Sequence, residues 1–364
     1  MSEYDRLLEP FRERKRRALA RAISAVEGER PGFQPFLHRL IKGGLSTPRV
    51  GITGPPGAGK STLVSAMAAE SRRRDEDVGI VAVDPTSPFS GVARLGDRIR
   101  MHDVASDPGI FIRSMATRGS LGGLATTTKE VLDVMDAFGF SRLLVETVGV
   151  GQSELEITGA TDTVAVVLVP ESGDGVQAMK AGLMEIADLF VVNKSDRPGA
   201  DRLVKEIRTA LKLRHGDASA NVPAHHGVDL RRLDQQGSSG GHQEGREDGP
   251  DEEAVPPWEV PIVQTVGQTG EGVAELLDTL DRHREHLKSS GEMERRLRAR
   301  ARARVEDVVR RELHRAAVRA MDEDRQLEEE LGAIVEGGET PYSVARRVLE
   351  GLGAEEVEER LPDR

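Results

Sequence analysis

The middle of the chain alternates between two hydrophobic patterns. Between about residues 49 and 280, short runs of apolar, often β-branched residues are separated by segments whose apolar positions recur every three or four residues. The runs are nearly continuous, which is typical of parallel strands that helices cover on both faces. The pattern therefore predicts an α/β fold, a three-layer sandwich with a mostly parallel sheet. The six predicted strands are 49–53, 78–83, 142–147, 163–169, 188–192 and 260–265.

Both ends of the chain have helical periodicity instead. In residues 1–45 the apolar positions with this spacing are Leu7, Leu8, Phe11, Ala18, Leu19, Ala22, Ile23 and Val26. Residues 292–350 are highly charged, and their apolar stripe comprises Leu297, Val305, Val308, Val309, Leu313 and Ala317. Such a stripe usually packs on the parent domain or on a second copy. We predict an N-terminal helical extension over 1–47, a central domain over 48–288 and a C-terminal helical arm over 289–364.

Residues 214–256 interrupt the pattern. They are rich in glycine, serine and charge, which predicts a disordered surface insertion. Four histidines in this segment suggest a metal site: His215, His225, His226 and His242. Polar loops collect histidines, and no carboxylate–histidine spacing on a regular element supports a metal here. We therefore favour the surface insertion.

Composition excludes several classes of protein. The net charge of −11 disfavours nonspecific binding to nucleic acid. The chain has no cysteine, which excludes disulfides, thiolate zinc sites, iron–sulfur clusters and cysteine nucleophiles. It contains no apolar run of about 18 residues that would span a membrane, and its acidic start lacks a signal core. We expect a soluble cytoplasmic protein.

The most informative motif follows the first predicted strand. Residues 54–62 read Gly-Pro-Pro-Gly-Ala-Gly-Lys-Ser-Thr and precede a helical segment. This is a complete G-x-x-x-x-G-K-S/T phosphate loop between a strand and a helix. Its glycines allow a nest of backbone N–H groups around a triphosphate, and the helix adds its positive end. The predicted binding residues are Gly54, Pro55, Pro56, Gly57, Ala58, Gly59, Lys60, Ser61 and Thr62, of which Lys60 reaches the β and γ phosphates and Ser61 can ligate Mg²⁺.

Acidic residues stand at the ends of two further predicted strands. Asp84 can hold Mg²⁺ or a metal-bound water, with an Asx-turn or a helix cap as the alternative. Glu146 ends an apolar strand, as the metal-side acid of a P-loop NTPase does, although a surface acid is the alternative. Gly149 has an N–H suited to the γ-phosphate, so 149–156 is predicted as a switch segment. Asp97 is a weaker second carboxylate.

A base-recognition motif ends the next strand. Asn193-Lys194-Ser195-Asp196 follows a buried run. Asp196 can accept from the N1–H and the exocyclic amine of guanine, a donor edge that adenine lacks, while Asn193 braces the loop and the Lys194 stem lies along the ring. The predicted nucleotide is therefore GTP or GDP rather than ATP. After the last strand, Val266, Gly267 and Gln268 are expected to close over the base with main-chain N–H groups.

With these motifs, the chain resembles the MeaB/ArgK family of G3E P-loop GTPases, which is related to the human methylmalonic aciduria type A protein. The resemblance rests on residues 51–63, 83–87, 95–101, 146–154 and 193–196, and extends to 17–27 and 340–345. It implies a GTPase that chaperones an adenosylcobalamin-dependent methylmalonyl-CoA mutase or a relative, gating cofactor loading and protecting the mutase. It also implies a homodimer that forms through the C-terminal helices, and Mg²⁺ held by Ser61, Asp84, Asp97 and Glu146.

The chain departs from the family pattern at three places. Val266 stands where Ser or Thr is usual, so a side-chain hydrogen bond to the base is lost. Val92 replaces a frequent glycine, and the 214–256 insertion has no counterpart in the family.

The expected reaction is in-line attack of water on GTP. Lys60 and Glu146 are the predicted catalytic residues, with Gln152 or Glu154 orienting the water; Arg98, Arg113 and Arg118 are candidates for an arginine finger. Alternatives are an ATP-dependent kinase or ATPase coupled to amino-acid transport, a metal-insertion GTPase, and a scaffold that does not hydrolyse nucleotide. We expect neither a nucleic-acid nor a membrane partner.

Overall fold

The computed structural model describes residues 3–84, 104, 106–116, 126–147, 157–170, 182–216, 255–324 and 326–351. The chain divides into two compact units, Met1–Arg296 and Leu297–Arg364.

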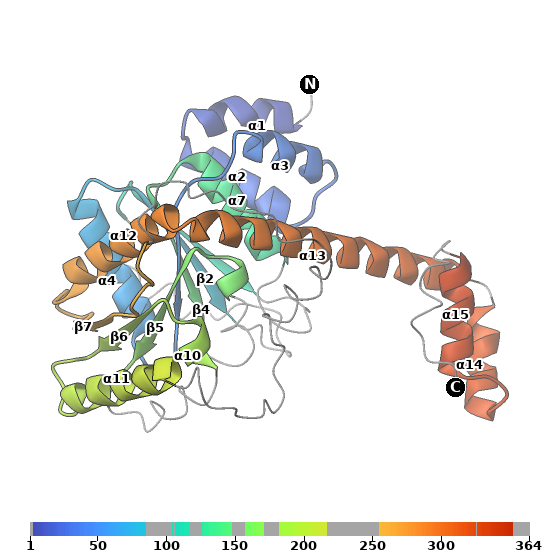
Figure 1. Ribbon diagram of the computed structural model, residues 1–364. Helices are drawn as coiled ribbons and strands as arrows, with labels where there is room; N and C mark the ends of the chain where they lie inside the picture. The colour runs from blue at the N-terminus through green and yellow to red at the C-terminus, as the bar shows by residue number, and fades with distance from the viewer. Residues whose placement is uncertain are drawn as a thin grey trace, which may run out of the picture. The chain divides into compact units, whose positions relative to one another are not determined.

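One parallel sheet organises the first unit (Figure 1). Across the described residues it has seven strands in the order β3-β2-β4-β1-β5-β6-β7, and every pairing is parallel. The strands are β1 (Arg49–Thr53), β2 (Val78–Asp84), β3 (Ile110–Ala116), β4 (Arg142–Thr147), β5 (Thr163–Leu168), β6 (Leu189–Asn193) and β7 (Ile262–Thr265). The predicted α/β fold is confirmed, and β1 lies at the centre between β4 and β5.

All six predicted strands are present, with bounds that differ by two residues or fewer. The seventh, β3, was not predicted from the sequence. Arg113 and Ser114 interrupt its apolar run, which hides the strand pattern. β3 lies at an edge of the sheet, where Arg113 forms an ion pair with Glu27, so a charged residue is tolerated there.

Helices cover both faces of the sheet. They are α1 (Glu3–Arg12), α2 (Arg16–Glu27), α3 (Phe33–Ile41), α4 (Lys60–Arg73), α7 (Thr126–Phe138), α10 (Leu183–Ile186), α11 (Ala200–Gly216) and α12 (Val273–Ser289), with a 3-10 turn η1 (Ile157–Gly159). Alternate strand residues enter two separate cores. In β5, Val164 and Val166 pack in the core that includes α7 and α11, whereas Val167 packs in the core that includes α4 and α12.

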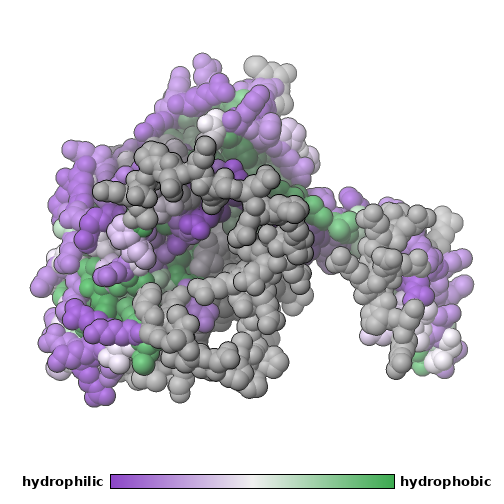
Figure 2. Space-filling view, viewed as in Figure 1, coloured by the Kyte–Doolittle hydropathy of each residue, from purple (hydrophilic) through white to green (hydrophobic). Residues whose placement is uncertain are grey.

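The N-terminal helices extend the core on the α7 side. The predicted apolar positions Leu7, Phe11, Leu19 and Ile23 are buried there, and Phe11 meets Phe138 of α7 edge-on. The outer surface of these helices is mainly hydrophilic (Figure 2). The prediction of amphipathic N-terminal helices is therefore confirmed.

A buried ion cluster fixes the start of β1. The Arg49 guanidinium contacts Asp133 Oδ1 at 2.9 Å and Asp136 Oδ2 at 3.0 Å, both on α7. Burial alone would lower the pKa of Arg49, but the two carboxylates outweigh burial and raise it. Asp136 Oδ1 also accepts hydrogen bonds from the N–H groups of Ser46 and Thr47. The strand that leads to the phosphate loop is thereby tied to α7.

The second unit is helical. It contains most of α13 (Glu292–Glu323), followed by α14 (Leu327–Glu336) and α15 (Pro341–Gly351). Val344 and Val348 of α15 are buried, and Arg347 forms ion pairs with Glu330 and Asp324. Among the described helices, none has the length and apolar character that crossing a membrane requires. The predicted domain boundaries stay predictions.

The predicted insertion overlaps the described residues only at its ends. α11 continues to Gly216, two residues past the predicted start of the insertion at 214, and the chain is described again from Val255. Residues 217–254 lie outside the described part.

Candidate nucleotide-binding site

The phosphate loop leaves β1 at the carboxyl edge of the sheet. Gly54, Gly57 and Gly59 have φ values of 138°, 80° and 82°, in the region that disfavours side chains. A Cβ on Gly54 would lie 2.1 Å from Val167 O, and one on Gly59 would lie 2.6 Å from Asn193 Nδ2. Gly54 and Gly59 are therefore required by both conformation and space, whereas Gly57, where a Cβ would meet nothing within 4 Å, is required by conformation alone. α4 begins at Lys60, which directs its positive end toward this loop.

Lys60 is held against the loop that precedes it. Its ammonium donates hydrogen bonds to Gly54 O at 2.8 Å and to Pro55 O at 3.0 Å, and the side chain is buried. A lysine ammonium is a compact positive charge suited to phosphate oxygens. The fold therefore places a cation and a set of loop N–H groups together, as binding of a triphosphate requires.

The Ser61 hydroxyl meets the Glu146 carboxylate. Oγ donates to Oε1 at 2.6 Å, and Glu146 is buried. The two come together because β4 pairs with β1 in a register that sets Glu146 beside Ile52, just before the loop. A hydroxyl and a carboxylate oxygen are the hard ligands that Mg²⁺ prefers, so this pair fits a magnesium ion.

The rest of the predicted metal set is only partly described. Asp84 ends β2, the neighbour of β4, but its side chain and all of Asp97 lie outside the described residues. In the described part of the chain, no group of three or more His, Cys, Asp or Glu side chains could hold a metal. The four-residue magnesium set thus stays a prediction.

The base-recognition loop contacts the phosphate loop directly. Asn193 Nδ2 donates to Ala58 O at 2.9 Å, and Lys194 Nζ donates to Gly57 O at 3.0 Å. Lys194 has a φ of 55°, a strained conformation for a residue with a side chain. Asp196 is exposed in the turn that follows. The two motifs predicted to bind phosphate and base therefore lie side by side.

The segment after β7 completes this side of the site. Asn193 Oδ1 accepts hydrogen bonds from Gly267 N at 3.0 Å and from Thr265 Oγ1 at 3.2 Å. Val266 N donates to Glu271 O, the Val266 side chain is buried, and Gln268 is exposed. The N–H groups of Val266 and Gly267 thus already have acceptors, and the predicted contact of this segment with a base stays a prediction.

Some residues that shape the site were not predicted. Thr147 Oγ1 donates to Thr53 Oγ1 at 2.9 Å and joins the ends of β4 and β1, next in sequence to Glu146. Thr265 supports Asn193 as described above. Thr147 and Thr265 each end an apolar strand. A polar residue at the end of an apolar strand is the sequence signal that could have identified them as site residues.

Other predicted site residues cannot be placed. Gly149, Gln152 and Glu154 lie outside the described residues, as do Arg98 and Arg118. Arg113 lies within the described residues, on the edge strand β3, and forms an ion pair with Glu27 of α2.

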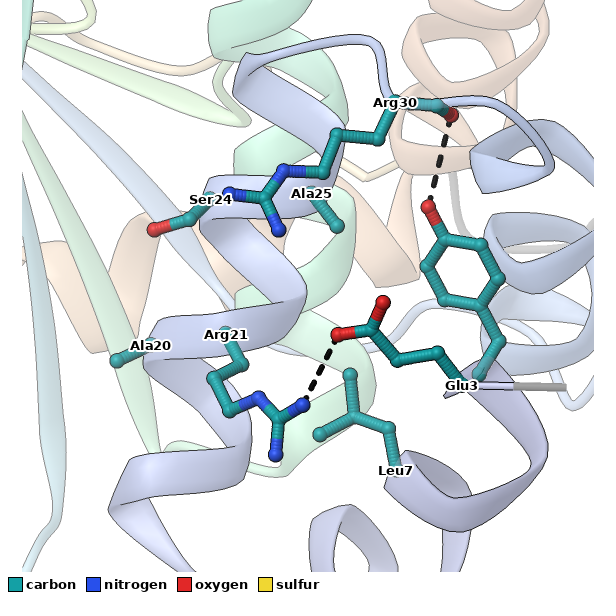
Figure 3. A pocket seen from close by; sticks show the side chains of 8 residues that line it. Glu3, Leu7, Ala20, Arg21, Ser24, Ala25 and Arg30 are labelled. Carbon is teal, nitrogen blue, oxygen red and sulfur yellow. Dashed lines mark hydrogen bonds and ion pairs between the residues drawn. The ribbon is translucent and has the colours of Figure 1, made fainter.

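A separate cavity of about 290 Å³ lies between α1 and α2 (Figure 3). Arg21 pairs with Glu3 across it, and the Tyr4 hydroxyl donates to Arg30 O. Leu7 and Ala25 contribute apolar walls. Arg21 and Glu3 pair with each other, and none of the lining residues is among the predicted nucleotide-binding residues, so we assign this cavity no role in nucleotide binding.

A parallel sheet, a phosphate loop after its central strand and an Asn-Lys-x-Asp loop beside it define a P-loop GTPase. The family model described as "Methylmalonyl Co-A mutase-associated GTPase MeaB" matches residues 19–322. The chain belongs to this family, which confirms the resemblance and the assignment as a GTP hydrolase.

Known proteins agree with this assignment. A putative GTPase of Pyrococcus horikoshii is 40% identical over 352 residues, covering 97% of this chain and 99% of the relative. The mitochondrial methylmalonic aciduria type A homolog of Mus musculus is 32% identical over 306 residues, covering 79% of this chain and 65% of the relative. A crystal structure described as a LAO/AO transport system kinase aligns with a TM-score of 0.61, over 97% of this chain and 99% of that one. At 22% identity it shows the fold alone.

Proposed function

We propose that this GTPase is a nucleotide-dependent chaperone for an adenosylcobalamin-dependent acyl-CoA mutase of the methylmalonyl-CoA mutase type. In this role it would gate loading of the cofactor and protect the mutase. The main support is the family match over residues 19–322, whose description names a mutase-associated GTPase. The mouse relative, named for methylmalonic aciduria, supports the same client.

The chemistry of the site follows from its own residues. Lys60 neutralises charge on the β and γ phosphates, and the loop N–H groups hold them in place. Ser61 and Glu146 would hold Mg²⁺, which supplies further charge neutralisation and orients the phosphates when bound. Asp196 accepts the donor edge of guanine, and Gln152 orients the attacking water. The acceleration of hydrolysis then comes from the positioning of the phosphates and from electrostatic stabilisation, rather than from a covalent intermediate.

Two finer assignments belong to the same proposal. The protein forms a homodimer through its C-terminal helices and works in the cytoplasm. The exposed apolar side chains of α13 support dimerisation, because such a helix face normally has a partner.

The proposal is tested by combining the purified protein with a purified methylmalonyl-CoA mutase. We expect a complex on size-exclusion chromatography, and a slow basal rate of GTP hydrolysis that rises in the presence of the mutase. Lys60→Ala should lose nucleotide affinity in calorimetry but keep its circular dichroism spectrum. If the mutase neither binds nor changes the hydrolysis rate, the chaperone proposal is wrong while the GTPase assignment remains.

The alternatives differ at named residues. An ATP-dependent kinase would not need a guanine-recognising residue such as Asp196. Competition between GTP and ATP for binding therefore distinguishes a GTPase from an ATP-dependent kinase. Metal-insertion GTPases need Cys or His ligands; this chain has no cysteine, and the described residues hold no cluster of metal ligands. Release of phosphate from GTP separates the enzyme from a scaffold.

A further inference from the structure

The cavity between α1 and α2 is lined by more positive than negative charge. Arg21 and Arg30 contribute two guanidinium groups, and Glu3 contributes one carboxylate. α1 begins at Glu3, so the positive end of this helix lies at the same place. The chain as a whole has a net charge of −11, against which this positive site stands out. The uncharged lining residues are Tyr4, Leu7, Ala20, Ser24 and Ala25.

The backbone of Arg30 is fixed by three hydrogen bonds. Arg30 N donates to Ala25 O at 3.0 Å, and Arg30 O accepts from Phe33 N at 3.0 Å. The Tyr4 hydroxyl donates to the same carbonyl at 3.5 Å. The Tyr4 ring is itself stacked on Phe36, with ring centroids 4.9 Å apart. The fold therefore determines the point from which the Arg30 side chain extends.

The Arg30 guanidinium lines the cavity without a partner (Figure 3). Across the described residues it makes neither a hydrogen bond nor an ion pair, whereas the Arg21 guanidinium is paired with Glu3. A guanidinium has five N–H donors in a fork that matches a carboxylate. A cation whose backbone is already fixed loses less conformational freedom when it binds an anion. Arg30 is thus prepared to bind one.

Glu3 indicates which anion suits this site. Its Oε1 accepts a hydrogen bond from Arg21 Nη2 at 2.9 Å across the cavity. Leu7 and Ala25 supply hydrocarbon surface in the same cavity. A carboxylate on a short hydrocarbon chain therefore matches both the cations and the apolar walls.

We propose that this cavity binds a small aliphatic carboxylate, with Arg30 as the main contact to its head group. Glu3 competes with the ligand for the second guanidinium, that of Arg21. The volume of about 290 Å³ is near the lower limit for ligand pockets, which favours a small molecule. The site lies apart from the predicted nucleotide-binding residues, and the inference does not depend on the proposed chaperone function.

Butyrate and its uncharged amide, butyramide, test the proposal by ligand-observed NMR titration of the full chain. We expect butyrate to bind with a dissociation constant of about 1 mM, which is realistic for so small a ligand. Butyramide should bind at least about tenfold more weakly, because it lacks the charge that the guanidinium groups recognise. Saturating GDP should leave the affinity for butyrate unchanged.

Two substitutions should shift the affinity for butyrate in opposite directions. Arg30→Gln removes the main cation and should weaken binding at least about tenfold. Glu3→Gln removes the competing carboxylate, frees the Arg21 guanidinium and should strengthen binding by about threefold. The matched control is Arg17→Gln, an exposed arginine of α2 that does not line the cavity, which should change nothing.

Ala20→Leu tests the cavity itself, because it fills part of the space and leaves every charge in place. We expect it to abolish measurable binding of butyrate. Circular dichroism and binding of GDP confirm that each variant is folded.

Several results would overturn the proposal. They are no saturable binding of butyrate, equal binding of butyramide, displacement of butyrate by GDP, and unchanged affinity in Arg30→Gln or Ala20→Leu. An equal loss in Arg17→Gln and Arg30→Gln would show attraction by general surface charge rather than a site. Unchanged or weaker binding in Glu3→Gln would contradict the competition. None of these results bears on the assignment as a GTPase or on the chaperone proposal.

Discussion

Asn193 joins the phosphate loop to the segment after β7. Its Nδ2 donates to Ala58 O at 2.9 Å, while its Oδ1 accepts from Gly267 N at 3.0 Å. The Asn193 side chain is buried, so water does not compete for either of these hydrogen bonds. One amide therefore holds together three loops that are far apart in the sequence and meet at the carboxyl edge of the sheet.

Replacing this amide should weaken both the fold and the site. Asn193→Ala leaves Ala58 O and Gly267 N without their partner, at a cost of about 1–3 kcal/mol for each buried group. We expect the free energy of unfolding to fall by about 3 kcal/mol and the affinity for GDP to fall at least about tenfold. Urea denaturation and calorimetry measure the two effects. Arg208→Ala, on the exposed side of α11, is the control. An Asn193→Ala variant with unchanged affinity for GDP would contradict the role of Asn193 in holding the binding loops together.

Asp196 should determine which base is accepted. In Asp196→Asn the amide presents a donor to the amine of guanine, so we expect the affinity for GTP to fall by about 100-fold or more. Xanthine carries a carbonyl in place of that amine and should accept from the new amide. Titration with GTP and with xanthosine triphosphate measures both. Equal loss for both nucleotides would show that the variant damages the loop rather than the recognition.

Ser61 and Glu146 should act through magnesium. Ser61→Ala and Glu146→Gln each remove one oxygen suited to the ion, so the hydrolysis rate should fall by about 100-fold at fixed Mg²⁺. Affinity for GDP in the presence of a chelator should stay at the wild-type value. Thr147→Val is the matched control, because it removes a buried hydroxyl next to Glu146 whose hydrogen-bond partner among the residues that the structure describes is Thr53 rather than Ser61 or Glu146. A similar loss of rate in Thr147→Val would point to general damage of the strand ends.

His283 should make stability depend on pH. Burial lowers the pKa of its ring to about 4, and the attraction of Asp188 does not offset this. As pH falls, the unfolded chain therefore takes up the proton first, near pH 6.5. The stability present above pH 6.5 is lost between about pH 6.5 and 4, by about 3 kcal/mol in total.

The sole tryptophan provides the signal for that measurement, because the Trp258 ring lies 4.7 Å from the His283 ring. Urea denaturation at several pH values should show the wild type losing stability more steeply than His283→Gln. The Thr163 hydroxyl contacts His283 Nδ1 at 2.8 Å. Thr163→Val removes this contact and is a second variant whose stability is compared with the wild type at the same pH values. Parallel curves for the wild type and His283→Gln would exclude His283 as the cause.

The sequence predicted those parts of the fold that local patterns determine. Six strands were predicted because each contains a run of mainly apolar residues, and β3 was missed because Arg113 and Ser114 interrupt its apolar run. The phosphate loop and Glu146 were found because their chemistry constrains the residue types and their place at strand ends. The bond from Asn193 to Ala58 and the ion cluster of Arg49 with Asp133 join residues far apart in the chain, so only the packed sheet brings them together.

The central claim is that this edge of the sheet binds a triphosphate and recognises its base as guanine. Displacement of a fluorescent GDP analogue by GTP and by ATP, at saturating Mg²⁺, tests it most directly. We predict that GTP displaces the analogue at a concentration at least about 100-fold lower than ATP. Equal displacement by the two nucleotides, or by neither, would contradict the account.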